Sequence, residues 1–129
     1  MQGNEYVKLA MRTNDKKATN RINKAILDET VLSDTGVDIG CMFNACLGLS
    51  GEVGETLDML KKWIFHEKEL DKDHLKKEIG DIMWYVAMMC HSLKFDLDEI
   101  LQMNLDKLKA RYPEGFDINK ANNRAEEDI

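Results

Sequence analysis

The stretch GEVGE, residues 51–55, decides the fold, because EIGD at residues 78–81 repeats its order of acid, β-branched residue, glycine and acid. Residues three apart are neighbours on a helix surface, so each copy can direct two carboxylates towards one place. Two such helices packed antiparallel would bring four carboxylates together. Like charges this close raise the pKa of at least one acid unless a counter-charge is supplied, and clusters of oxygen ligands suit hard cations such as Mg²⁺. The repeat therefore predicts two helices that hold a metal site.

The acids lie at the border of the apolar helix faces. At about 100° per residue, Glu52 and Glu78 each border the apolar stripe of their helix, and Glu55 and Asp81 lie one step further out. Carboxylates beside large apolar side chains lose hydration, which costs several kcal/mol per ion unless a partner is supplied. A lone ExxE is usually a solvated charge pair, but the repeat and this position favour a site. The large side chains that share the border are Met59, Trp63, Tyr85 and Met89.

Four glycines lie inside these helical patterns. Gly48, Gly51, Gly54 and Gly80 each cost about 1 kcal/mol relative to alanine in a helix. Close approach of a neighbouring backbone is the usual reason for such a residue, and a kinked or frayed helix is the alternative. Because Gly54 and Gly80 occupy equivalent places in the two copies, we expect close approach.

The length and composition describe one domain. A chain of 129 residues, 43% hydrophobic and 33% charged, can bury one core but not two. We expect a single helical domain at residues 1–118 and a polar, flexible tail at 119–129. The net charge of −6 argues against a nucleic-acid partner.

The chain carries no signal for a membrane or for export. No apolar run is long enough to span a bilayer, and the N-terminus lacks the regions of a signal peptide, so we expect a cytoplasmic protein without a membrane partner. Cys41, Cys46 and Cys90 show no CxxC spacing. We expect them to be buried free thiols.

Apolar spacing predicts helices throughout, and no segment alternates with period two, so the expected class is all-α. The expected N-terminal caps of the last three helices are Asp38, then Asp71 or Asp73, and then Asp96. The thin apolar stripe of the second helix predicts a four-helix-bundle-like unit that completes its core by oligomerising, as a homodimer or homotetramer. The expected helices span about residues 4–12, 17–32, 38–65, 71–93 and 96–110, with a turn at 33–36.

The last of these helices carries a polar side. Asn104, Lys107 and Arg111 are spaced by three and four, so an amide and two cations share one side. They could be a solvated face that complements the helix dipole. Alternatively they could hold phosphate oxygens, since Arg offers a bidentate fork and Lys a point charge. A carboxylate-bound Mg²⁺ and a basic pair together would make a triphosphate site.

These motifs resemble the MazG-like all-α nucleoside triphosphate pyrophosphohydrolases, which are related to the dimeric dUTPases and dCTP pyrophosphatases. The family pattern of ExxE, a spacer and ExxD stands here at residues 52–55 and 78–81. Downstream, NLDK at 104–107 and RYPEGF at 111–116 are also similar. The resemblance covers residues 45–116, and AMRT at 10–13 looks like an N-terminal element of small members.

The resemblance implies hydrolysis of a (d)NTP between the α and β phosphates, with house-cleaning of the nucleotide pool as the expected role. By carry-over, Glu52, Glu55, Glu78 and Asp81 would bind Mg²⁺, for which Mn²⁺ could substitute. The metal would orient the polyphosphate and help to make hydroxide from water. Glu55 is our candidate for the base, because its outer position could reach a water.

The resemblance also implies which residues contact the nucleotide. Lys107 and Arg111 would hold the phosphates, with Asn104 nearby. Trp63, Trp84 and Tyr85 are candidates for stacking on the base. Trp63 and Tyr85 could instead be core residues, and Trp84 could lie in a subunit interface.

Two other functions stay open at this point. A phosphoribosyl-ATP pyrophosphohydrolase shares the architecture and the type of motif. A non-enzymatic helical interaction module would use the acidic face to bind a basic partner, although such a degenerate member would be expected to lose an acid. All four acids are present in this chain.

Overall fold

The fold is built from helices, as expected. The computed structural model describes residues 2–27 and 36–124, and no strand occurs in this part of the chain. The all-α prediction is therefore confirmed. The elements are α1 (Gly3–Ala10), the 3₁₀ helix η1 (Met11–Thr13), α2 (Ala18–Leu27), α4 (Ile39–Phe65), α5 (Lys72–Leu93), α6 (Leu97–Arg111) and α7 (Ile118–Asn122).

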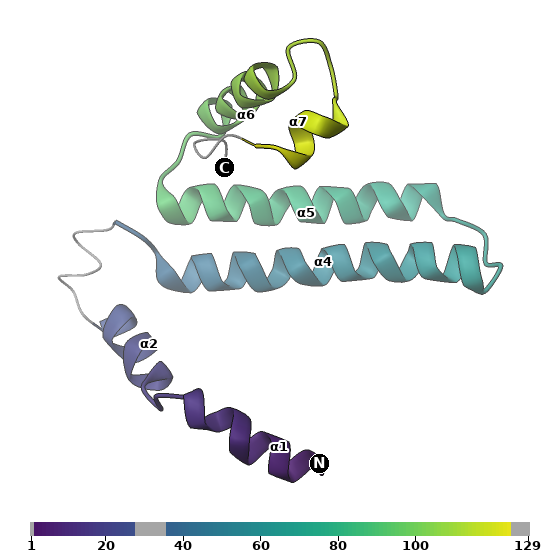
Figure 1. The fold of residues 1–129 in the computed structure, drawn as a ribbon. Coiled ribbons are helices and arrows are strands. Elements are labelled where there is room, and N and C mark those ends of the chain that lie inside the picture. Colours follow the sequence, from purple (N-terminus) through teal and green to yellow (C-terminus); the bar gives the residue numbers. More distant parts are fainter. Residues whose placement is uncertain (1, 28–35, 125–129) are drawn as a thin grey trace.

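The two helices that carry the acidic motifs form an antiparallel hairpin. Figure 1 shows α4 and α5 side by side along most of their length, joined by the short link at 66–71. At the other end of the hairpin, the Asp38 backbone N–H donates to the Ser92 carbonyl at 2.9 Å. The register of α4 against α5 is therefore held by the covalent link at one end and by this hydrogen bond at the other.

Helix ends follow the expected capping chemistry. The Asp38 side chain accepts from the Cys41 N–H at 3.0 Å. Of the two candidates for α5, Asp71 is the cap, since its carboxylate accepts from the His74 N–H at 2.9 Å. Such caps satisfy amide groups that the helix itself leaves without a partner. Asp96 caps α6 by accepting from the Asp98 N–H at 2.9 Å.

One glycine allows close packing within the hairpin. A Cβ atom at Gly48 would lie 2.1 Å from Cε1 of the Tyr85 ring, so the absence of a side chain lets this ring lie against α4. The prediction of close backbone approach was wrong, because the neighbour at Gly48 is a side chain. At Gly51, Gly54 and Gly80 no neighbouring atom lies within 4 Å of the place that a Cβ would occupy.

The hydrophobic core of the single chain is small. Ala45 is the only hydrophobic side chain among the described residues that is fully buried, and Ser92 and Glu78 are the buried polar ones. Large apolar side chains on α4, α5 and α6 remain exposed, among them Leu47, Ile79 and Leu105. Cys41, Cys46 and Cys90 are free, as expected. The prediction that they are buried is wrong, because Cys46 is exposed and the other two are partly exposed.

The remaining differences from the expected elements lie near the chain ends. The stretch predicted as one helix at 4–12 is α1 followed by η1, and α2 begins at Ala18. The predicted continuation of α2 to residue 32 and most of the turn at 33–36 lie outside the described residues. Residues 118–122 form α7, capped by Asp117, where the sequence predicted the start of a flexible tail. Residues 125–129 of that tail also lie outside the described part.

Within residues 2–27 and 36–124, no helix is both long enough and apolar enough to cross a membrane.

Candidate metal centre and adjoining cavity

Three of the four predicted acids come together across the hairpin. Carboxylate oxygens of Glu52, Glu55 and Glu78 lie within 4.8 Å of one another. α4 supplies the first two and α5 the third. Asp81 is exposed and lies outside this trio, but its negative charge contributes to raising the pKa of Glu52. The antiparallel hairpin therefore places the two motifs opposite each other, as the repeat predicted.

Burial differs between the inner and outer acids as the helical wheel predicted. Glu78 is 5% exposed and Glu52 is half-buried, whereas Glu55 and Asp81 are exposed. Burial is the main cause that raises the pKa of Glu52, and the neighbouring carboxyl groups of Glu78, Glu55 and Asp81 add to it. The expectation that at least one crowded acid has a raised pKa is confirmed.

Only one of the two oxygens of the Glu78 carboxylate has a partner among the described residues. Its Oε1 lies 2.7 Å from Nε2 of His74, one helical turn earlier on α5. Its Oε2 is buried and has no hydrogen-bond partner among the described residues. A buried acceptor without a partner costs about 1–3 kcal/mol. A cation between the carboxylates would remove this cost and the mutual repulsion, so the donor set fits a hard divalent metal such as Mg²⁺.

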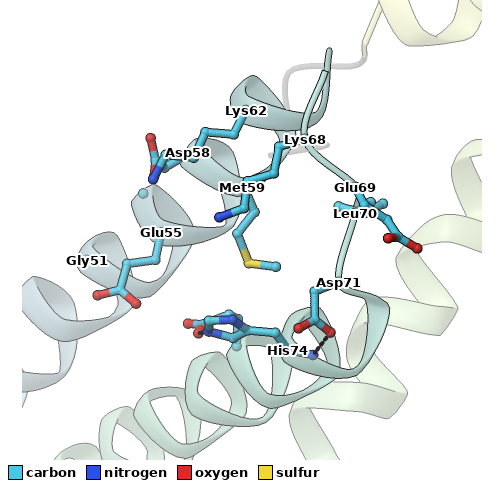
Figure 2. Close-up of a pocket in the computed structure, with 12 residues that line it drawn as sticks. Gly51, Glu55, Asp58, Met59, Lys62, Lys68, Glu69, Leu70, Asp71 and His74 are labelled. Carbon is cyan, nitrogen blue, oxygen red and sulfur yellow. Dashed lines mark hydrogen bonds and ion pairs between the residues drawn. The ribbon is translucent and has the colours of Figure 1, made fainter. Parts of the chain in front are cut away.

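A cavity of about 610 Å³ adjoins the acids at the linked end of the hairpin. This volume is in the range of sites that bind small molecules. In Figure 2 the walls of this cavity come from α4, with Glu55, Met59 and Lys62, and from the start of α5, with Asp71 and His74. The link between the helices contributes Lys68, Glu69 and Leu70 to the cavity wall.

Two of the unexplained glycines line this cavity. Gly51 and Gly54 belong to its wall, and a Cβ atom at either would meet no neighbour within 4 Å. Their missing side chains therefore leave space beside the carboxylates instead of allowing helices to pack. Gly80 does not line the cavity, and nothing in the structure explains it.

Several residues of the cavity wall were not predicted from the sequence. His74 lies four residues before Glu78, and helical spacing could have paired them. Lys62 forms an ion pair with Asp58 at 2.6 Å, at the same spacing. The partner of Lys62 is therefore Asp58, which does not belong to the two acidic motifs. Lys68 lies in the link, where no periodicity could have indicated its direction.

The predicted nucleotide contacts lie elsewhere in the chain. None of them lines the cavity beside the acids. The Arg111 guanidinium carbon lies 5.8 Å from the centre of the Tyr112 ring. Trp84 meets Tyr85 edge-on at 5.0 Å, and Tyr85 itself packs on Gly48, which favours the packing role for Tyr85. The side chains predicted to contact the nucleotide are Asn104, Lys107, Arg111, Trp63, Trp84 and Tyr85.

The fold and site thus describe an all-α protein in which a helical hairpin brings acidic motifs together around a buried carboxylate. The model of the MazG nucleotide pyrophosphohydrolase domain matches residues 44–116, which include all four acids. This chain belongs to that family, so the resemblance is confirmed. The family supports nucleotide pyrophosphohydrolase as the class of activity, and its metal dependence agrees with the carboxylate cluster.

A curated relative lies in a bacteriophage. The chain is 37% identical over 83 residues to the "Gene 37 protein" of Mycobacterium phage L5, an alignment that covers 60% of this chain and 72% of the phage protein. The printed name of that protein describes no activity. No solved structure matches this chain.

Proposed function

We propose that this chain hydrolyses a nucleoside or deoxynucleoside triphosphate between its α and β phosphates, releasing a monophosphate and pyrophosphate. The observation that carries the proposal is the buried Oε2 of Glu78, which lacks a partner among the described residues and belongs to a trio of carboxylates beside a cavity of about 610 Å³. Such chemistry would suit removal of unwanted nucleotides from the pool. The family match favours it over a phosphoribosyl-ATP pyrophosphohydrolase.

The acids would hold the metal, and we propose Mg²⁺, with Mn²⁺ as a substitute. Glu52, Glu55 and Glu78 supply the clustered oxygens, and Asp81 is the fourth ligand by resemblance. When bound, the metal would neutralise phosphate charge and lower the pKa of a coordinated water. Through its contact with Oε1, His74 holds the Glu78 side chain so that Oε2 stays directed away from the imidazole.

Glu55 is the proposed base. It lines the cavity and is exposed, so its carboxylate can accept a proton from a water there. Glu78 is less suited, because one of its oxygens already contacts His74. Proton transfer by a positioned side chain typically accelerates a reaction by about 10²–10⁴-fold.

We also propose that the chain acts as a homodimer or homotetramer. The support is the apolar surface left on α4, α5 and α6, which a second copy could cover. Assembly would also provide a way for the basic side of α6 to reach the cavity of a neighbouring copy. One domain at residues 1–118 remains our proposal for the organisation of the chain.

Pyrophosphate release is the direct test. With Mg²⁺, the protein is expected to release pyrophosphate from at least one of the eight common (d)NTPs, and EDTA is expected to stop the reaction because the acids alone cannot neutralise the phosphates. The measurement is a coupled pyrophosphate assay on each nucleotide. Orthophosphate as the initial product would place the cleavage elsewhere and contradict the proposal.

A double substitution on α6 tests the proposed phosphate contacts there. Lys107→Ala with Arg111→Ala is expected to raise KM by about tenfold or more, because two charge-assisted hydrogen bonds would be lost. Circular dichroism would check that the fold is retained. Unchanged KM and kcat would assign both residues to a solvated helix face.

A further inference from the structure

The cavity wall carries several carboxylates and two lysines. Glu55 and Glu78 belong to the carboxylate cluster itself. Lys62 and Lys68 contribute positive charge near the link, where three more acids, Asp58, Glu69 and Asp71, also belong to the wall. In Figure 2 the side chain of Lys68 extends from the link into the cavity, towards the side on which Glu55 lies. Two of the acids near the link are already engaged, because Asp58 is paired with Lys62 and Asp71 caps α5 by accepting from the His74 N–H.

The two lysines differ in their partners. Lys62 is paired with Asp58 at 2.6 Å. Among the described residues, Lys68 makes no ion pair. Its position is nevertheless defined, because its backbone N–H donates to the Lys62 carbonyl at 3.1 Å. Glu67 before it adopts a left-handed conformation with φ of 54°, which turns the link back over the end of α4.

An exposed lysine is ordinarily solvated, so its location decides what it can do. Lys68 lines the same cavity as two of the clustered carboxylates. A bound triphosphate brings more negative charge than one divalent metal neutralises, and these acids add to it. Cations must supply the rest. Within this chain, the cavity offers Lys62 and Lys68 for that purpose, whereas Lys107 and Arg111 do not line it.

We propose that Lys68, assisted by Lys62, forms a subsite for the pyrophosphate half of the substrate, the β and γ phosphates. This inference rests on the proposed function. The scissile bond must lie at the metal ligands, so the two phosphates beyond it extend towards the link. The nucleoside carries no charge that would need these cations, and it extends in the other direction.

Calorimetric titration with inorganic pyrophosphate and Mg²⁺ tests the subsite directly. Lys68→Ala is expected to weaken pyrophosphate binding by about tenfold or more, since a hydrogen bond between charged groups is lost. KM for the (d)NTP should rise as well, while affinity for Mg²⁺ alone and for the monophosphate product stays unchanged. Lys68→Arg should restore much of the binding.

Lys61→Ala is the matched control. Lys61 directly precedes Lys62, and its side chain does not line the cavity. The substitution removes the same charge, so the Lys61→Ala variant should bind pyrophosphate as the parent does. If the parent releases pyrophosphate from a (d)NTP but Lys68→Ala keeps the parent's pyrophosphate affinity, the subsite alone is overturned. If the parent releases no pyrophosphate from any (d)NTP, the proposed function falls, and the substrate subsite falls with it.

Discussion

Glu55→Gln and Asp81→Asn are each expected to reduce turnover by about a hundredfold or more, while the metal-free protein stays at least as stable to heat. Both side chains are exposed, so the substitutions remove no packing. Each removes a negative charge that raises the pKa of Glu52, and hence removes repulsion. Activity assays and metal-free melting curves measure the two effects separately.

Magnesium provides the internal comparison for these variants. A ligand that binds only the folded state stabilises it by mass action, so Mg²⁺ should raise the Tm of the parent, and this increment should shrink or vanish in both variants. Asp73→Asn is a matched control, because Asp73 is an exposed acid on α5 paired with Lys76 at 3.2 Å. An equal Mg²⁺ increment in all four proteins would refute the carboxylate site.

The raised pKa of Glu52 adds a dependence on pH. Above the ordinary value of 4.5, the folded metal-free protein keeps a proton on Glu52 that the unfolded chain has lost. Stability therefore falls as the pH rises from the ordinary to the raised pKa. Glu52→Gln removes this contribution, so its Tm relative to the parent should increase across that pH range. Metal-free melting curves at several pH values would show it.

Gly48→Ala is expected to destabilise the protein by up to about 2 kcal/mol, because overpacking usually costs about 1–3 kcal/mol and alanine returns about 1 kcal/mol of helix propensity. The new Cβ would lie 2.1 Å from Cε1 and 2.2 Å from Cζ of Tyr85, and a ring wedged between two helices cannot move aside freely. Urea denaturation gives the free energy of unfolding.

Gly80→Ala is the matched control for this second prediction. A Cβ atom there meets no neighbour within 4 Å, so the variant should gain up to about 1 kcal/mol in the metal-free protein. Gly48→Ala should cost less in a Tyr85→Ala background than in the parent, because the overlap is absent there. If Gly48→Ala were as stable as Gly80→Ala, the ring would not lie against α4 as described.

Local chemistry made much of the fold predictable. Asp38 and Asp71 are short acidic side chains just before segments with helical spacing of apolar residues. Each accepts a hydrogen bond from the backbone amide three residues later. Likewise, the repeated motif indicated which acids border the apolar faces, and Glu78 is indeed buried. These features depend on neighbours within one or two turns of the same helix.

Features that depend on the distance between helices were not predictable in this way. The spacing of Gly48 could not show that a tyrosine ring, and not a backbone, approaches it. Periodicity likewise placed Glu55 and Asp81 in equivalent positions. Only the relative rotation and shift of α4 and α5 decide that Glu55 joins the trio whereas Asp81 stays outside it.

The short link between α4 and α5 also bears on how the chain folds. The clustered carboxylates come from segments adjacent in sequence, so bringing them together closes only a small loop and loses little chain entropy. The hydrogen bond between Asp38 and Ser92 then completes the same hairpin without involving α1, α2 or α6. The cation-binding geometry can thus form early in folding, before the flanking helices have found their places.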